Sequence, residues 1–310
     1  MKISRQTEPP AVPQGVYAAT ITPRRDGEVE VDLGAMLDVI DFVTSRGVNG
    51  VCLFGSTGEF LHYTAEERSR FIGLATKRSR VPVLANISHS TLDGAIAMAE
   101  EAAGAGVAGV LAMPPYFFRY DPGSIRQFFL ELAAQVTKWT PVYLYNIPVF
   151  SNPIPLDTAV ELLESGAFAG IKDSGGDWEY LYALIRVRER VPVRVLCGDD
   201  RLFRQARQYG ADAGISGVAS AAPELMAALS RAVDSGDTAR IEHLEARVNE
   251  FIDWISRFPV PVGVREAARL RGIKTGSPAV PPGEEGRTAL AQFQPWFRDW
   301  IKVIEHECKP

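Results

Sequence analysis

The stretch PVYLYNIPVFSNPIPLDTAVELLESGAFAGIKD, residues 141–173, contains the pattern on which our fold prediction rests. It begins with an apolar run, residues 141–145, and it ends with a second apolar run, residues 168–172. Neither run alternates with polar residues, which is typical of parallel strands that are buried on both faces. Between the runs, the segment that contains Leu162 and Leu163 has a helical pattern. We therefore predict a strand, a helix and a second parallel strand within this stretch.

The same alternation of apolar runs and helical patterns extends over most of the chain. The runs that we predict to be strands are residues 15–21, 50–54, 81–87, 109–112, 141–145, 168–172, 192–197 and 213–216. Eight strands that alternate with eight helices predict an α/β fold, a (β/α)8 TIM barrel. A doubly wound open sheet shares this alternation and is the alternative, but eight units of nearly equal length favour closure.

After the last predicted strand, only helical patterns remain. Helices are predicted over residues 237–257, 263–272 and 286–306, with a proline-rich break at residues 278–282. We expect residues 14–235 to form the barrel that carries the active site. Residues 236–310 are expected to form a C-terminal helical region.

The composition excludes several classes of protein. The 310 residues carry a formal net charge of −5, so a strongly basic nucleic-acid-binding protein is excluded. No apolar run is long enough for a transmembrane helix, and residues 1–10 lack the apolar core of a secretory signal. The three cysteines show no zinc-binding spacing and predict no disulfide framework. We expect a cytoplasmic protein.

Lys172 is the most informative residue at a strand end. In a TIM barrel, active sites lie at the carboxyl ends of the strands, and Lys172 closes one of the apolar runs. Desolvation disfavours the ammonium form, which increases the share of neutral amine that can attack a ketone and form a Schiff base. The alternative is a lysine at the rim of the barrel that is paired with Asp173 or Glu59.

Two other strand ends carry candidate residues. Tyr145 closes the preceding predicted strand, where it is either a general acid or base or a ring packed on the barrel rim. The turn Gly55-Ser56-Thr57-Gly58-Glu59 leaves the N–H groups of Ser56 and Thr57 free to bind a carboxylate or a phosphate. The alternative for this segment is an ordinary turn between a strand and a helix.

In combination, these motifs resemble one family. The segments Gly-Ser-Thr-Gly-Glu (55–59), Tyr-Asn-Ile-Pro (145–148) and Gly-Ile-Lys-Asp-Ser (170–174) occur in the order seen in the dihydrodipicolinate synthase/N-acetylneuraminate lyase family. Ala-Thr-Ile-Thr-Pro (19–23) and Cys-Gly-Asp-Asp (197–200) match the family as well. The resemblance covers almost the whole chain. It implies a barrel with C-terminal helices, usually a homotetramer, and class I aldolase chemistry on pyruvate or another 2-oxo acid, without a metal or organic cofactor.

The resemblance also assigns roles to individual residues. It implies that Lys172 forms the Schiff base and that Tyr145 is the acid/base that assists imine formation and moves protons at the reacting bond. Ser56 and Thr57 match the hydroxyl pair of the family. Their backbone N–H groups are expected to hold the substrate carboxylate, with the Ser56 hydroxyl against Tyr145.

Four further positions are expected to line the substrate pocket. Gly198 and Ile215 match family positions around pyruvate. Phe117 stands where many members have a tyrosine that is donated across a dimer. Phe150 stands where dihydrodipicolinate synthases have an arginine for the carboxylate of the second substrate, and its loss is not a conservative change.

The N-acetylneuraminate lyase branch fits the chain only in part. Those lyases have an Asp-Glu pair where this chain has Asp200-Arg201, and they have a serine at the position of Gly217. A second substrate that is less polar than in either branch, or a 2-keto-3-deoxy sugar acid, is therefore the hypothesis.

The function that we predict is a Schiff-base lyase that makes or breaks a carbon–carbon bond between pyruvate, or a related 2-oxo acid, and an aldehyde. The expected partners are these small molecules and copies of the chain in a homotetramer or homodimer, with no nucleic acid and no membrane. The alternatives are a 4-hydroxy-tetrahydrodipicolinate synthase proper and a 2-keto-3-deoxy acid dehydratase that uses the same imine. A non-catalytic binder of 2-oxo acids is a third alternative, which the retention of Lys172, Tyr145, Ser56 and Thr57 disfavours.

Overall fold

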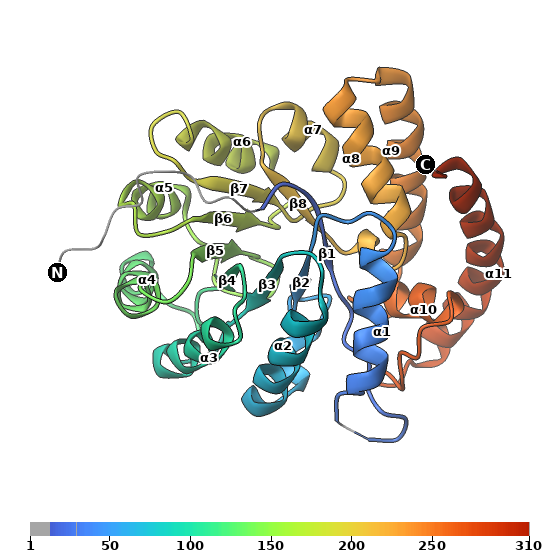
Figure 1. The fold of residues 1–310 in the computed structure, drawn as a ribbon, viewed down its shortest axis with the longest axis horizontal. Helices are drawn as coiled ribbons and strands as arrows, with labels where there is room; N and C mark the ends of the chain where they lie inside the picture. Colours follow the sequence, from blue (N-terminus) through green and yellow to red (C-terminus); the bar gives the residue numbers. More distant parts are fainter. Residues whose placement is uncertain (1–12, 29, 310) are drawn as a thin grey trace. The chain divides into compact units, whose positions relative to one another are not determined.

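The structure, a computed structural model, describes residues 13–28 and 30–309 of the chain. Within these residues, eight strands follow one another in chain order around a closed barrel (Figure 1). The strand bounds are β1 Gly15–Ala19, β2 Gly50–Leu53, β3 Val83–Asn86, β4 Gly109–Ala112, β5 Val142–Asn146, β6 Gly170–Asp173, β7 Arg194–Cys197 and β8 Ala213–Ser216. The predicted (β/α)8 barrel is confirmed, and every predicted strand overlaps an observed one.

A helix follows each strand before the next begins. These helices are α1 Leu33–Thr44, α2 Ala65–Arg78, α3 Leu92–Gly104, α4 Pro122–Val136, α5 Leu156–Glu164, α6 Trp178–Val187, α7 Phe203–Gln208 and α8 Pro223–Ser235. Single 3₁₀ turns, η1 Phe60–His62 and η2 Val218–Ser220, precede α2 and α8. The predicted C-terminal helices are present as α9 Thr238–Ile255, α10 Val262–Leu270 and α11 Glu284–Glu307. No helix of the described residues is both long and apolar enough to cross a bilayer.

Local sequence signals explain where helices begin and end. At the start of α2, Thr64 and Glu67 form a capping box, in which each side chain accepts a hydrogen bond from the other's backbone N–H. Glycines follow several helices and adopt left-handed φ values between 73° and 107°, as their place before a strand predicts. These glycines are Gly47, Gly106, Gly166 and Gly210.

The described chain divides into two compact units, residues 13–14 with 82–215 and residues 15–28 with 30–81 and 216–309. In the first unit, helices α3 to α6 lie outside the strands that they connect (Figure 1). Its strands pair in parallel from β3 to β8. The ring of Phe129 on α4 makes an edge contact with Phe168, with 6.1 Å between the ring centroids. The division of the chain at residue 235 stays a prediction.

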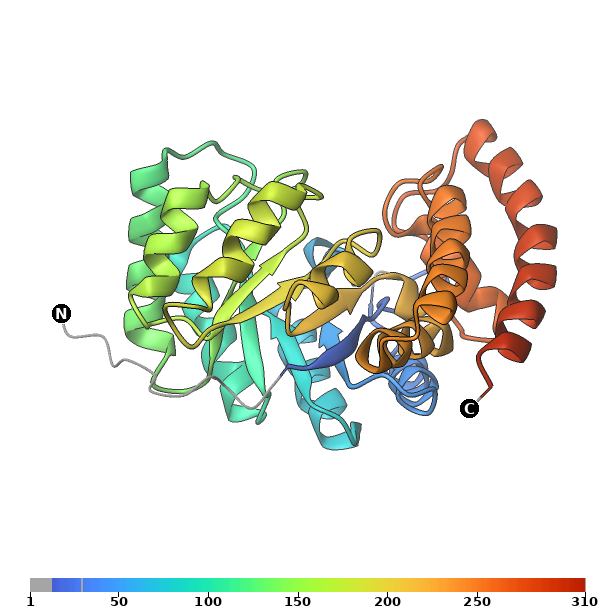
Figure 2. The ribbon, with the colours of Figure 1, turned by 90° about the horizontal axis from the view of Figure 1, so that it is seen from above.

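In the second unit, α9 and α11 lie side by side (Figure 2). The buried face of α11 repeats every three or four residues and is largely aromatic, with Phe293, Phe297 and Trp300. Phe251 of α9 stacks on Trp300 at 5.3 Å between ring centroids. Burial of this aromatic stripe holds α11 against α9.

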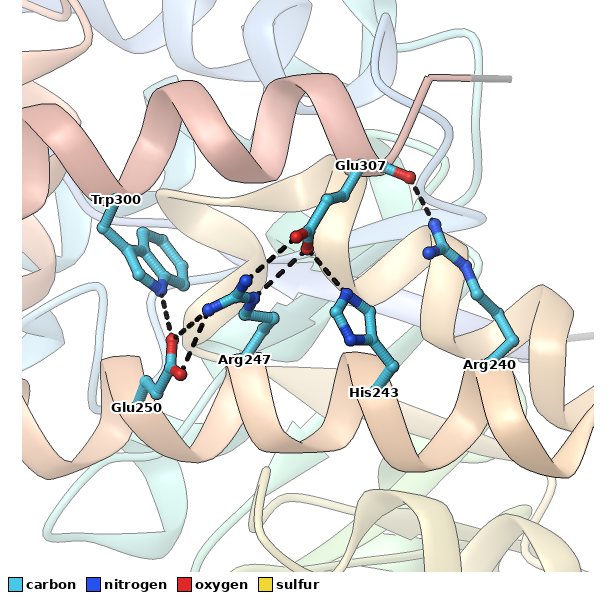
Figure 3. A network of polar contacts seen from close by, with 6 residues as sticks. All are labelled: Arg240, His243, Arg247, Glu250, Trp300 and Glu307. Atoms are coloured by element: carbon cyan, nitrogen blue, oxygen red, sulfur yellow. Dashed lines mark hydrogen bonds and ion pairs between the residues drawn. The ribbon is translucent and has the colours of Figure 1, made fainter.

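A polar network connects the C-terminal part of α11 to α9 (Figure 3). The Glu307 carboxylate of α11 accepts hydrogen bonds from Arg247 Nη2 at 2.9 Å and Nε at 3.2 Å, and His243 Nε2 lies 2.9 Å from Glu307 Oε2. Arg247 also donates to Glu250, which accepts a hydrogen bond from the indole of Trp300 at 2.9 Å. The network and the aromatic stripe together fix the register between the two helices.

Candidate active site

Lys172 and Tyr145 lie side by side on neighbouring strands of the first unit. They are register partners between β6 and β5, so both side chains leave the same face of the sheet. Both are buried, with Lys172 only 3% exposed. The Nζ atom of Lys172 lies 4.0 Å from the centroid of the Tyr145 ring. The structure therefore brings together the residues predicted as nucleophile and as acid/base.

This environment acts on the amine in two opposite ways. Burial disfavours the charged ammonium, whereas the face of the Tyr145 ring attracts a cation. A lysine under both influences can give up its proton to become a nucleophile and can also be stabilised when charge returns as an iminium. Lys172 is therefore not an exposed lysine at the rim, whereas its role as nucleophile stays a prediction.

Gly198 lies directly against the Lys172 side chain. A β-carbon at Gly198 would stand 2.8 Å from Lys172 Cε and 2.0 Å from Ser174 Oγ, distances that atoms do not tolerate. The absence of a side chain at this position therefore leaves the space that the lysine stem occupies. Ile215 is buried on β8. The residue two positions before it, Ala213, pairs with Leu196 of β7, which in turn pairs with Lys172 of β6. Because side chains two residues apart on a strand leave the same face, Ile215 lies on the same face of the sheet as Lys172.

On the opposite face of the same strands, Asn146 and Asp173 form a buried pair that was not predicted from the sequence. Asn146 Nδ2 donates to Asp173 Oδ1 at 2.7 Å, and the N–H of Gly175 donates to the same oxygen at 3.3 Å. Burial raises the pKa of Asp173 to about 6, although both hydrogen bonds oppose the shift. The dipeptides Tyr145-Asn146 and Lys172-Asp173 could have predicted this pair, because the register that pairs Tyr145 with Lys172 also pairs Asn146 with Asp173.

Asp173→Asn is expected to stabilise the protein at neutral pH and to leave its stability unchanged near pH 4. The raised pKa means that the native state binds more protons than the unfolded chain between the ordinary value of 3.8 and about 6, so the native state loses stability as pH rises through this window. Asparagine keeps an acceptor oxygen and carries no charge, so it avoids this loss, which amounts to about 3 kcal/mol above pH 6. Denaturant unfolding of the wild type and the variant at pH 4 and pH 8 measures the difference. A variant that is no more stable than the wild type at pH 8 contradicts this assignment.

Ser56 and Thr57 lie in the turn that follows β2, in the second unit. The turn is closed by hydrogen bonds from the N–H of Gly58 to Gly55 O and from the N–H of Glu59 to Ser56 O, both at 3.1 Å. Thr57 is buried and Ser56 is partly exposed. The tight turn that the two glycines predict is confirmed, whereas the binding roles of the two residues stay predictions.

Phe117 and Phe150 lie on loops at the surface of the first unit. Phe117 is 90% exposed and has a φ of 78°, and Phe150 is 50% exposed. Their loops are joined by Asn152, whose amide nitrogen donates to Pro115 O at 2.6 Å and Phe118 O at 2.8 Å. The amide oxygen of Asn152 accepts a hydrogen bond from the N–H of Tyr120 at 3.1 Å. Asn152 thereby holds the aromatic loop after β4 to the loop after β5.

Within residues 13–28 and 30–309, no group of three or more His, Cys, Asp or Glu side chains is placed to hold a metal ion. A cavity of about 740 Å³ lies at the end of α6 and the start of β7, between Tyr182 and Val193. None of the predicted site residues lines this cavity.

Comparison with known proteins gives consistent matches along the chain. The model of the Dihydrodipicolinate synthetase family matches residues 12–293. An uncharacterised DapA-like lyase of Halobacterium salinarum is 31% identical over 271 residues, which are 86% of this chain and 88% of that protein. The 4-hydroxy-tetrahydrodipicolinate synthase of Methanosarcina barkeri is 30% identical over 271 residues, 86% of this chain and 91% of that protein. The crystal structure of YagE, a prophage protein of the dihydrodipicolinic acid synthase family from E. coli K12 in complex with pyruvate, has a TM-score of 0.85 and 25% identity and covers 94% of this chain and 99% of that chain.

Proposed function

Since the chain belongs to the dihydrodipicolinate synthetase family of Schiff-base lyases, we propose that it makes or breaks a carbon–carbon bond between pyruvate, or a related 2-oxo acid, and an aldehyde. The observation that carries the proposal is the buried Lys172 amine over the face of Tyr145. YagE, whose fold this chain shares, was crystallised with pyruvate, which supports pyruvate as the 2-oxo acid.

The proposed reaction begins with attack of the neutral Lys172 amine on the ketone carbon of the 2-oxo acid. The ketone oxygen leaves as water, and the lysine nitrogen becomes an iminium. Through the former ketone carbon, the iminium draws electrons from the methyl or methylene carbon beside it. Loss of a proton from that carbon gives an enamine, which attacks the aldehyde carbon while the aldehyde oxygen takes up a proton. Water then hydrolyses the imine and frees the lysine. Cleavage runs through the same steps in reverse.

The remaining residues support these steps. Tyr145 supplies and removes the protons, since its ring lies next to the reacting nitrogen. Ser56 and Thr57 are proposed to bind the carboxylate of the 2-oxo acid through their backbone N–H groups. Gly198 and Ile215 are proposed to leave space for its small body, and the contact of Gly198 with the Lys172 stem supports this role.

Reduction with borohydride tests the proposed function directly. We expect the protein to gain the mass of one reduced pyruvyl group per chain when it is incubated with pyruvate and reduced. Peptide mapping is expected to place that group on Lys172. A folded sample that gains no mass with pyruvate or with longer 2-oxo acids contradicts the proposal and favours a binder without turnover.

For the second substrate we propose an aldehyde that lacks a carboxylate near the site of attack, or a 2-keto-3-deoxy sugar acid in the cleavage direction. Phe150 supports this proposal, because an apolar ring replaces the arginine that binds a carboxylate in dihydrodipicolinate synthases. A panel of aldehydes offered with pyruvate measures the preference. Rapid turnover of aspartate semialdehyde would instead favour a 4-hydroxy-tetrahydrodipicolinate synthase, the activity of the Methanosarcina relative. Loss of water without carbon–carbon cleavage would favour a dehydratase.

We also propose that the chain assembles as a homodimer or homotetramer. The loop after β4 exposes three aromatic side chains, Phe117, Phe118 and Tyr120, which is more apolar surface than one loop of a monomer usually presents. The hydrogen bonds of Asn152 hold this loop in one shape, which favours a contact surface. Sedimentation of the purified chain gives the assembly, and a monomer at micromolar concentration contradicts the proposal.

A further inference from the structure

The turn after β2 has left-handed backbone at both ends. The φ of Phe54 is 56° and that of Glu59 is 51°. Residues with a β-carbon rarely adopt such values, and they keep them where the surrounding structure holds them in place. Phe54 is held by its buried ring, which makes edge contacts with Tyr63 at 6.0 Å and Phe71 at 5.6 Å between centroids. Glu59 is held by a different means, a charged contact with α10.

Glu59 forms a buried ion pair with Arg265. Arg265 Nη1 lies 2.8 Å from Glu59 Oε2, and the two side chains are only 5% and 8% exposed. The other carboxylate oxygen, Oε1, lies 3.3 Å from Nδ1 of His62. Charges that are withdrawn from water are costly unless they are paired with good geometry, so each member of the pair fixes the position of the other.

Arg265 is also connected to the turn through Thr22. The same Nη1 donates to Thr22 O at 2.8 Å, and the hydroxyl of Tyr63 donates to that carbonyl at 3.0 Å. The Thr22 hydroxyl in turn donates to Gly58 O at 2.8 Å. Arg265 Nη2 donates to Thr275 O, which anchors the guanidinium from its other side. The last two residues of the turn, Gly58 and Glu59, are therefore both connected to one guanidinium.

We propose that Arg265 is a positioning residue, which acts through Glu59 and Thr22 to hold the Ser56–Thr57 turn in the shape that binds the carboxylate of the 2-oxo acid. This inference rests on the carboxylate-binding role proposed for that turn. It assigns to α10, a helix outside the barrel repeat, an indirect part in substrate binding. A planar guanidinium is suited to this task because it can serve three acceptors at fixed angles, which an ammonium cannot do.

The test is a pyruvate titration of the borohydride-trapped adduct in Arg265→Lys. Lysine keeps the positive charge and loses the fork of donors. We expect the pyruvate concentration for half-maximal adduct to rise about tenfold, as the loss of well-aligned hydrogen bonds to a charged group predicts. The maximal adduct is expected to stay at one per chain, because Lys172 is untouched. A role confined to stability gives the reverse, a lower maximum from unfolded molecules with an unchanged half-saturation.

Two further variants complete the test. Arg269→Lys is the matched control, since Arg269 lies on the same helix and pairs with Glu266 at 2.7 Å. We expect this variant to need the same pyruvate concentration for half-maximal adduct as the wild type. Glu59→Gln keeps an acceptor for Arg265 without the charge, and we expect it to raise the pyruvate concentration for half-maximal adduct to a smaller extent. If Arg265→Lys does not fold, Glu59→Gln alone tests the positioning role of Arg265.

The possible outcomes separate the inference from the function on which it rests. A wild-type half-saturation in folded Arg265→Lys, or in Glu59→Gln if only that variant folds, overturns the positioning role and leaves the proposed function intact. The same holds for a reduced maximum at unchanged half-saturation. Absence of an adduct in the wild type overturns the proposed function and this inference with it.

Discussion

Lys172→Ala is expected to form no borohydride-trapped adduct with pyruvate and to lose its lyase activity down to the background rate. The amine is the only atom that forms the covalent bond in the proposed reaction, so no other residue can replace it. The variant is expected to fold, since Lys172 contributes one side chain to a barrel whose strands pair along their backbones. Intact mass after reduction measures the adduct, and circular dichroism checks the fold.

Two companion variants sharpen this result. Lys172→Met retains most of the stem beside Gly198 without the amine, so it separates the missing nucleophile from a cavity. Lys138→Ala removes an exposed lysine near the end of α4 and is expected to behave as the wild type does. If Lys172→Met still carried a pyruvyl group, the nucleophile would be another residue, and the assignment of β6 as the catalytic strand would be wrong.

Tyr145→Phe is expected to slow turnover by about 10²-fold or more while still allowing the adduct to accumulate. The substitution keeps the ring that lies 4.0 Å from Lys172 Nζ and removes only the phenolic hydroxyl. A positioned acid or base contributes about 10² to 10⁴ in rate, so loss of the hydroxyl is expected to lower kcat more than it raises KM. Steady-state kinetics with pyruvate and the best aldehyde of the panel measure both constants.

Tyr143→Phe is the matched control for this prediction. Tyr143 lies two residues earlier on β5, is equally buried and leaves the same face of the strand, but its register partner is Gly170. We expect its kcat to stay near that of the wild type. Equal rates in Tyr145→Phe and the wild type would show that protons move through another group.

The sequence was sufficient to predict the fold because each βα unit carries its own local signals. Apolar runs marked the strands, and glycines such as Gly166 marked helix ends with left-handed backbone. Even α11 was predicted as one helix, although Pro295 lies inside it. The division at residue 235 was argued from the point where strands stop, whereas compactness divides the chain elsewhere, because β1 and β2 are grouped with the C-terminal helices.

The candidate site was predictable only where neighbouring strands define it. Lys172 and Tyr145 close consecutive strands, so parallel register alone brings them together. The ion pair between Glu59 and Arg265 spans 206 residues, and no local pattern marks which of many arginines Glu59 contacts. The exposure of Phe117 was equally unpredictable, because it depends on how a loop is held by Asn152.

The amide of Asn152 has a consequence for directed evolution of this protein. Its three hydrogen bonds connect segment 147–152 to segment 115–120, so a backbone shift in one segment is expected to move the other. Libraries that randomise only the Phe150 loop will therefore also displace Phe117 and its aromatic neighbours. Recombination with relatives should exchange both segments as a single cassette that includes Asn152, since a chimera that inherits one segment alone leaves the backbone groups of the other without their shared partner.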